Sequence, residues 1–404
     1  MAAPHSSLRL ALVTGGLDLG GTTTFLCNFA GELIRRNLPV QVFSFEQENP
    51  LESDFLRLRI PLSVENQHRY IFEDRLVSVL GKLAAFQPTV VVGNLSSPPF
   101  EVMRYVPDGV FRIGTVQSDD PLWYAMLHRY APVLDLVAAV SAHIAASVKS
   151  LPEFARVPVS LLPYGVPMPS NPRLARESGG PLRILYLGRL IQEQKRVQLF
   201  PTILQQLQAA HMPFHWTIAG EGPERGWLET ALTAAVAAGQ VSFAGKIEYA
   251  DVPALLDRHD VFLLASAYEG LPLSLLEAMG HGLVPVVSDL PSGIREVVDG
   301  RRGILVAPEN IAGYAAAIIQ LHRNRDQLRS FSQAAREKVR SGYSIAAMTD
   351  RWLAALPPGP ATISPWPDKI AVRPILGMSH PWRFSAPMRQ ARRLVLRLKG
   401  GRPR

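Results

Sequence analysis

The sequence contains a single cysteine, Cys27, among 404 residues, so an internal disulfide is excluded. A chain without disulfides is typical of a reducing compartment, and we predict a cytoplasmic location. The sequence also lacks an apolar run of the roughly 18 residues that a membrane-spanning helix needs. The short apolar stretch Leu8–Thr14 has no cleavage-type spacing after it. It therefore predicts a first β-strand and not a signal peptide.

Acidic residues are absent from residues 383–404, which hold seven arginines and one lysine. These eight charges account for the formal net charge of +8, so the rest of the chain is neutral overall. A nucleic-acid binder instead clusters its basic residues across a folded face, and we expect no nucleic-acid partner. A remote alternative is nucleic-acid binding through the tail, which salt would weaken steeply.

Within this tail, Met388–Lys399 predicts a short helix with apolar residues on one side and arginines mostly on the other. Such a helix can lie on an anionic membrane surface, where each basic residue contributes roughly 1 kcal/mol. The protein would then be peripheral at the inner face of the membrane. The alternative is a tail that is disordered or docked on the protein body, and the sequence leaves both open.

The chain length indicates about two domains. In the first half, short apolar runs alternate with amphipathic stretches, one of which places Phe25, Phe29 and Leu33 on one helical face. This alternation is typical of a parallel sheet covered by helices on both faces. The predicted strands of this half are Leu8–Thr14, Val40–Phe45, Thr89–Gly93, Phe111–Val116, Leu136–Val140 and Val159–Leu162.

A stretch rich in Pro and Gly interrupts the pattern at residues 166–182, which we interpret as a linker. The alternation then restarts, with predicted strands at Arg183–Leu187, His215–Ala219, Val241–Phe243, Val261–Ala265 and Pro285–Ser288 and helices at Val252–Arg258 and Leu273–Met279. We therefore predict an α/β fold with two Rossmann-like, doubly wound domains facing across a cleft. The domains are residues 1–165 and 183–345, followed by a crossover segment and basic tail at 346–404.

Two glutamates follow the fourth predicted strand of the second domain. Glu269 lies in the loop after the strand, and Glu277 lies inside the next helix, which Pro272 helps to start. Open α/β sheets bind ligands at the carboxyl ends of their strands. The free N–H groups of a helix N-terminus there favour a phosphate. A carboxylate deeper in the helix can accept hydrogen bonds from vicinal hydroxyls. Alone, each glutamate would more often be a solvated acid.

Two cations follow the first strand of the same domain. The text LYLGRL ends in Gly188 and Arg189, and Lys195 comes six residues later. Fixed cations can stabilise the negative charge that develops on a leaving nucleoside diphosphate without a metal. Arg presents a planar fork to phosphate oxygens and Lys a point charge.

The segment EGLPLSLLEAM, followed by VPVVSD and GIREVVDGRRGILV, resembles the Glu-x7-Glu region of glycogen-synthase-like retaining glycosyltransferases with the GT-B fold. The resemblance covers Arg183–Tyr343 well and is looser in the first domain. It implies that Glu277 binds the nucleotide ribose, and that Glu269 contacts the transferred sugar and balances charge at the reacting carbon. It also implies that Arg189 and Lys195 hold the donor diphosphate. The family commonly has Lys-Gly at this place, whereas Arg196 follows Lys195 here.

The resemblance further implies a donor site extending to the turns around these residues. Gly220, in a Gly-x-Gly-Pro turn after a strand, could line the site or simply shape the turn. Lys246 and Ile247 could frame the base. The full set of predicted donor-binding residues is Gly15, Gly16, Gly20, Gly188, Arg189, Lys195, Gly220, Lys246, Ile247, Glu269, Gly270, Leu271 and Glu277.

The glycines of the first domain, Gly15, Gly16 and Gly20, lie between the first strand and the first helix. Their spacing is neither a Walker loop nor a dinucleotide fingerprint. In the resembled family a loop at this position reaches the donor phosphate, and we expect contact through backbone N–H groups. The alternative is an ordinary tight turn between strand and helix.

The acceptor side departs from the family. Gln117 stands where many relatives carry a His, and an amide cannot serve as a general base. Gln117 could still position a sugar hydroxyl, and Asp119 is a candidate substitute acid or base. The pair Asp119–Asp120 has no companion cluster of metal ligands, so we expect no metal and no cofactor beyond the nucleotide-sugar donor.

The predicted function is a metal-independent, retaining hexosyltransferase that acts on a saccharide or lipid-linked acceptor in polysaccharide or glycolipid biosynthesis. The predicted catalytic residues are Glu269, Arg189, Lys195, Asp119 and Gln117. Two other classes stay open. One is another GT-B enzyme, such as a phosphorylase or an epimerase. The other is a catalytically weak nucleotide-binding or scaffold protein, which Gln117 motivates. The sequence does not separate UDP from GDP donors.

Overall fold

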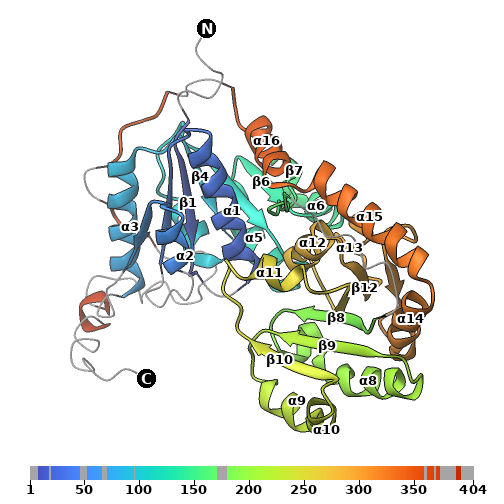
Figure 1. Ribbon diagram of the computed structural model, residues 1–404. Coiled ribbons are helices and arrows are strands. Elements are labelled where there is room, and N and C mark those ends of the chain that lie inside the picture. The colour runs from blue at the N-terminus through green and yellow to red at the C-terminus, as the bar shows by residue number, and fades with distance from the viewer. Residues whose placement is uncertain are drawn as a thin grey trace. The chain divides into compact units, whose positions relative to one another are not determined.

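The computed structural model describes residues 8–17, 20–45, 52–65, 71–94, 96–170, 180–358, 362–367, 370–373 and 388–392. The chain divides into two compact units. The first comprises Met1–Ala139, Ala145–Leu161 and Trp352–Arg404, and the second comprises Val140–Ile144 and Leu162–Arg351. Figure 1 labels their helices and strands.

The first unit is built on a seven-stranded, all-parallel sheet with the order β3-β2-β1-β4-β5-β6-β7. The chain runs outward from β1 to β3 and returns to place β4 on the other side of β1, so the topological switch point lies between β1 and β4. The strands are β1 (Leu10–Thr14), β2 (Val40–Ser44), β3 (Leu62–Val64), β4 (Val90–Gly93), β5 (Phe111–Val116), β6 (Leu136–Ala139) and β7 (Val159–Leu161).

Every residue of β1, β4 and β6 is buried, as expected for strands of a parallel sheet that is covered on both faces. The covering helices carry apolar residues at helical spacing. They are α1 (Gly21–Arg35), α2 (Glu52–Arg57), α3 (Phe72–Phe86), α4 (Ser97–Val102), α5 (Pro121–Tyr130) and α6 (Ala142–Lys149), with 3-10 turns η1 (Ala131–Val133) and η2 (Pro152–Phe154).

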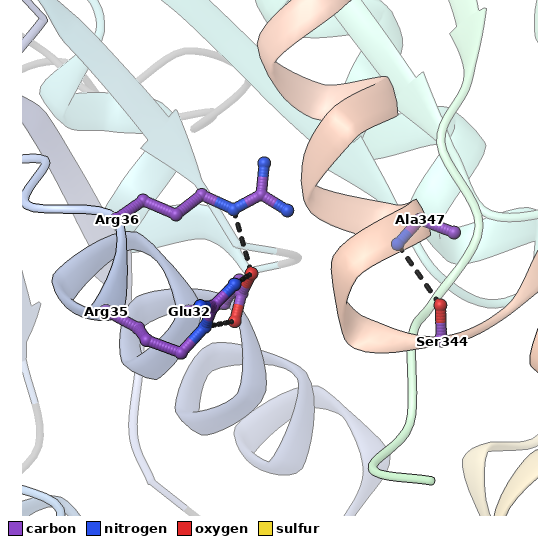
Figure 2. Close-up of polar contacts among 5 residues, drawn as sticks. All are labelled: Glu32, Arg35, Arg36, Ser344 and Ala347. Atoms are coloured by element: carbon purple, nitrogen blue, oxygen red, sulfur yellow. Dashed lines mark hydrogen bonds and ion pairs between the residues drawn. The ribbon is translucent and has the colours of Figure 1, made fainter.

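Helix α1 is fixed at its C-terminal end by a carboxylate with two partners. Glu32 is 8% exposed and binds the guanidinium groups of Arg35 and Arg36, as Figure 2 shows. The hydrogen bond from Arg35 is the main cause that lowers the pKa of Glu32. On its apolar side, Phe25 and Phe29 pack against Trp352, with ring centroids 5.7 and 4.9 Å away.

The C-terminal segment lies along the first unit. The Ser364 backbone N–H donates to the Asp108 carbonyl at 2.9 Å, and the Arg373 N–H donates to the Tyr105 hydroxyl at 2.9 Å. Residues 388–392 are helical, and Arg392 forms a two-pronged ion pair with the buried carboxylate of Glu73 on α3. The predicted helix Met388–Lys399 is thus observed at 388–392, and its remainder lies outside the described residues.

The second unit has a six-stranded, all-parallel sheet with the order β10-β9-β8-β11-β12-β13. Its switch point lies between β8 and β11 for the same topological reason. The strands are β8 (Leu182–Leu187), β9 (Phe214–Ala219), β10 (Val241–Gly245), β11 (Val261–Leu264), β12 (Val284–Ser288) and β13 (Ile304–Val306).

The helices of this unit follow the strands in alternation and pack on the sheet mainly through α12, α14 and α15 (Figure 1). The Ser344 hydroxyl accepts the Ala347 N–H at 3.3 Å and thereby caps the last helix (Figure 2). The helices are α7 (Gln192–Lys195), η3 (Val197–Leu199), α8 (Phe200–Ala209), α9 (Arg225–Ala231), α10 (Thr233–Ala237), α11 (Val252–Leu256), α12 (Leu273–Gly280), α13 (Ile294–Val297), α14 (Ile311–Arg323), α15 (Arg325–Gly342) and α16 (Ile345–Ala355).

The prediction of two doubly wound α/β domains is confirmed. Two strands were not predicted, β3 and β13, and both are three-residue edge strands. Their partial exposure leaves them without the continuous apolar run that marks the central strands. Among the described helices, none is both long and apolar enough to cross a membrane.

Candidate donor site and the polar residues of the first unit

The predicted Arg, Lys and Glu residues lie after the two strands that flank the switch point of the second sheet. Arg189 and Lys195 follow β8, and Glu269 follows β11, its neighbour in the sheet. Carboxyl ends of parallel strands meet at one edge, so residues that are 74 positions apart in the chain come into contact.

Lys195 and Glu269 form a close, buried ion pair. Lys195 Nζ donates to Glu269 Oε1 at 2.5 Å, and the hydroxyl of Ser266 donates to the same oxygen at 2.7 Å. The two charged side chains are only 12% and 6% exposed. Because the dielectric is low in such surroundings, the pair holds both groups in fixed positions.

Arg189 is exposed, and its guanidinium is held from one side by an amide that sequence reasoning missed. Arg189 Nη2 donates to Gln194 Oε1 at 2.8 Å. Gln194 Nε2 donates to the Tyr268 carbonyl at 3.4 Å, and the Ala267 N–H donates to the Gln194 carbonyl at 2.8 Å. The loop after β11 is therefore bound to the short helix α7. A buried glutamine beside two charged residues was the signal in the sequence.

Arg196 occupies the place where the resembled family commonly has Gly. Its φ is 51°, in the left-handed region that favours glycine. The side chain compensates by donating to the Pro308 carbonyl at 2.9 Å. The departure at this position thus keeps the backbone turn that ends α7, at a cost in local strain of roughly 1–2 kcal/mol.

Glu277 lies in the second turn of α12, and no other described residue forms a hydrogen bond or ion pair with its carboxylate. Burial raises the pKa of Glu277 from 4.5 to about 7. Part of the side chain remains accessible, so the shift reflects the surrounding protein and not complete enclosure. An unpaired, half-buried carboxylate is suited to accept hydrogen bonds from hydroxyl groups of a ligand.

The predicted glycines shape the loops at this edge of the sheet. A Cβ on Gly220, whose φ is 132°, would lie 1.9 Å from the Gly188 carbonyl oxygen. A Cβ on Gly222 would lie 2.3 Å from the Leu190 carbonyl oxygen. Leu190 N–H donates to the Glu221 carbonyl at 2.8 Å. The loops after β8 and β9 therefore interlock with no room for side chains at these two positions.

The remaining predicted donor residues of this unit lie nearby in the topology. The Gly270 carbonyl accepts the Gly293 N–H at 2.7 Å, and Leu271 is buried. Lys246 follows β10, where its N–H donates to Glu221 at 3.2 Å and its ammonium pairs with Glu248 at 2.9 Å. Ile247 is partly exposed beside it.

In the first unit, Gly15 and Gly16 follow β1, and Gly20 precedes α1. A Cβ on Gly15 would lie 2.6 Å from the Ser96 hydroxyl oxygen, so this glycine permits a close approach between two loops. Gly16 accepts a hydrogen bond from the Thr14 hydroxyl at 2.9 Å. Gly20 is exposed, with open space at its Cβ position.

Gln117 follows β5, and its amide meets that of Asn94, which follows β4. Gln117 Nε2 donates to Asn94 Oδ1 at 2.7 Å, and both side chains are more than nine-tenths buried. Gln117 Oε1 and Asn94 Nδ2 have no partner among the described residues. Exchanging the O and N atoms of both amides would again leave one donor and one acceptor unpaired.

The neighbouring aspartates have structural contacts. Asp119 accepts a hydrogen bond from the Tyr124 hydroxyl at 2.6 Å, and Asp120 caps α5 by accepting the Leu122 N–H at 2.9 Å. Within the described part of the chain, no three His, Cys, Asp or Glu side chains gather in a way that could hold a metal ion. Metal independence itself remains a prediction.

Residues 181–324, most of the second unit, match the family model of the glycosyl transferases group 1. The glycogen synthase of Mycobacterium tuberculosis is 32% identical over 169 residues, which are 42% of this chain and 40% of that protein. The putative colanic acid biosynthesis glycosyltransferase WcaL of Escherichia coli is 34% identical over 196 residues, 46% of this chain and 47% of that protein. The chain thus spans less than half the length of these curated relatives.

The whole chain is similar in fold to Staphylococcus aureus TarM, whose crystal structure contains fondaparinux, alpha-GlcNAc-glycerol and UDP. The TM-score is 0.71 at 13% identity, and the match covers 86% of this chain and 99% of that chain. At this identity the likeness concerns the fold alone. The predicted GT-B fold class is therefore confirmed.

Proposed function

We propose that this protein is a retaining hexosyltransferase that uses a nucleotide-diphosphate sugar and a hydroxyl acceptor on a saccharide or a lipid-linked saccharide. The observation that carries the proposal is the gathering of Arg189, the Lys195–Glu269 pair and the unpaired Glu277 at the switch point of the second sheet. The family match over residues 181–324 supports it. The named roles of the relatives in glycogen and colanic acid synthesis support a place in polysaccharide or glycolipid biosynthesis.

In the proposed reaction, the bond between the anomeric carbon of the sugar and the diphosphate oxygen breaks, and its electron pair leaves with the diphosphate. Arg189 and Lys195 stabilise the negative charge that develops there. Glu269 lies against Lys195, where its carboxylate offsets positive charge at the anomeric carbon. The acceptor oxygen forms the new bond on the same face, and its proton passes to the leaving phosphate. Glu277 binds the ribose hydroxyls.

Metal independence belongs to this proposal because the charge of the leaving group falls to side chains. The test is thermal stability with UDP, GDP and ADP in the presence of EDTA. A ligand at 100 times its Kd adds about 2.7 kcal/mol to the free energy of unfolding. We expect one nucleotide to stabilise the protein, and Arg189→Ala and Glu277→Ala to abolish the shift.

The matched control is Arg301→Ala, because Arg301 is exposed in the loop before β13, at the amino end of that strand. Its shift should equal that of the wild type. A folded protein that no nucleotide stabilises would exclude the donor-site assignment. A shift that EDTA abolishes would exclude the metal-independent mechanism.

A second candidate is a nucleotide-binding scaffold with weak transfer activity. The favouring observation is that Gln117 does not titrate, while Asp119 is engaged by Tyr124. Incubation with the nucleotide sugar and polysaccharide acceptors distinguishes the two candidates. Nucleotide binding without release of free diphosphate in any acceptor mixture would favour the scaffold.

We also propose that the basic tail brings the protein to an anionic membrane surface. Arg392 already binds Glu73, so the contribution comes from the basic residues at 393–404. Truncation after Arg392 should reduce cosedimentation with vesicles containing phosphatidylserine and leave the weak binding to phosphatidylcholine vesicles unchanged. Equal binding of the full chain to both vesicle types would contradict this role.

A further inference from the structure

Gln194 lies between the two loops that carry the charged groups of the proposed donor site. It is 9% exposed and sits on α7, one residue before Lys195. Its Oε1 accepts from Arg189 and its Nε2 donates to the Tyr268 carbonyl. A guanidinium only donates and a carbonyl only accepts, so this orientation of the amide is the only one that satisfies both neighbours.

The charges around this amide do not cancel. Lys195 is neutralised by Glu269 at 2.5 Å, whereas Arg189 is bound by a neutral acceptor. The group of Arg189, Lys195 and Glu269 therefore keeps one net positive charge, carried by an exposed guanidinium. A carboxylate in the place of the amide would make a second ion pair, and the net charge would fall to zero.

We infer that Gln194 is a positioning residue that orients Arg189 towards the donor diphosphate while leaving its positive charge available to it. The same amide ties Arg189 to the loop of Glu269, so that the cation and the carboxylate keep a fixed separation. This inference rests on the proposed function, because the charge matters only if a diphosphate binds here. A role in packing alone would need shape and burial but no particular charge.

The substitution Gln194→Glu separates charge from shape. It retains an acceptor for Arg189, adds one negative charge and places a carboxylate oxygen against the Tyr268 carbonyl. Gln194→Met keeps the length of the side chain without charge or hydrogen bonds. The matched control is Gln192→Glu on the same short helix, whose side chain forms no hydrogen bond with the described residues.

The experiment measures Kd by calorimetry for a nucleoside diphosphate and for its nucleoside, using whichever of UDP, GDP and ADP the wild type binds. We expect Gln194→Glu to weaken diphosphate binding by about tenfold to a hundredfold and to change nucleoside binding by less than about twofold. Its diphosphate affinity should also depend less on salt than that of the wild type. Gln194→Met should weaken diphosphate binding by about tenfold or less, and Gln192→Glu by less than about twofold.

Equal losses for the diphosphate and the nucleoside in Gln194→Glu would overturn the inference, since they would indicate a general packing defect. Unchanged diphosphate affinity in that variant would overturn it as well. If the wild type binds none of the three diphosphates, the proposed function fails, and the role of Gln194 falls with it. The wild-type titration therefore distinguishes the two failures.

Discussion

At the scale of single residues, Glu277 couples the proposed ligand site to stability. Burial raises its pKa from 4.5 to about 7, so the folded protein holds its proton more tightly than the unfolded chain. This contribution is fully present below pH 4.5 and is lost as the pH rises through about 7.

We predict that Glu277→Gln stabilises the unliganded protein at pH 8 by about 1–3 kcal/mol and has no effect near pH 4. Urea unfolding at both pH values measures this difference. Glu193→Gln, which removes an acid from an exposed position on α7, is the control. A stabilisation of equal size at both pH values would contradict the assignment of the effect to ionisation.

The buried pair of Lys195 and Glu269 gives a second prediction at this scale. Lys195→Met leaves a carboxylate that is 6% exposed without its cation, and we expect a loss of about 3–5 kcal/mol in the free energy of unfolding. The double variant Lys195→Met/Glu269→Gln should recover most of that stability but no transferase activity. Urea denaturation together with a transfer assay tests both parts. Additive losses in the double variant would show that the pair does not interact.

At the scale of elements, the loops after β8 and β9 depend on two glycines. Gly220→Ala and Gly222→Ala place a methyl group on neighbouring carbonyl oxygens, at 1.9 and 2.3 Å. We predict a loss of at least about 2 kcal/mol in each and a weaker nucleotide-induced thermal shift.

The control for this prediction is Gly226→Ala in the first turn of α9, where nothing lies within 4 Å of the added Cβ. Because Ala favours helix over Gly, this variant should be neutral or stabilised by up to about 1 kcal/mol. Thermal unfolding of the three variants measures the contrast. Equal destabilisation of all three would rule out the steric explanation.

At the scale of the whole molecule, the C-terminal segment is part of the first unit. Trp352 packs on α1, and Arg392 neutralises Glu73, whose side chain is 2% exposed. Of the two arrangements that the sequence left open for the tail, docking on the body holds for residue 392. The residues beyond it lie outside the described part of the chain.

We predict that Arg392→Met destabilises the full chain by about 2–4 kcal/mol, because it leaves a buried carboxylate without a partner. Adding Glu73→Gln should restore most of the loss. Arg389→Met, four positions short of a full turn on the same five-residue helix, removes a cation without touching Glu73 and is the control. Chemical denaturation measures all three. A double variant no more stable than Arg392→Met would contradict the proposed role of the pair.

The sequence by itself determined the alternation of strands and helices, the two α/β units and the positions of Arg189, Lys195, Glu269 and Glu277. These follow from local patterns, since apolar periodicity and turn residues act over a few neighbours. It indicated β3 and β13 poorly because short, partly exposed edge strands carry little of that periodicity.

Only the tertiary structure decided which side chains meet. The bonds from Gln194 to Tyr268, from Gln117 to Asn94 and from Arg392 to Glu73 join residues 74, 23 and 319 positions apart. No local pattern encodes these pairs, because they arise from strand order and from the folding back of the C-terminal segment. The charge balance of the proposed donor site depends on the first of them, and that balance follows from the arrangement of loops around the switch point.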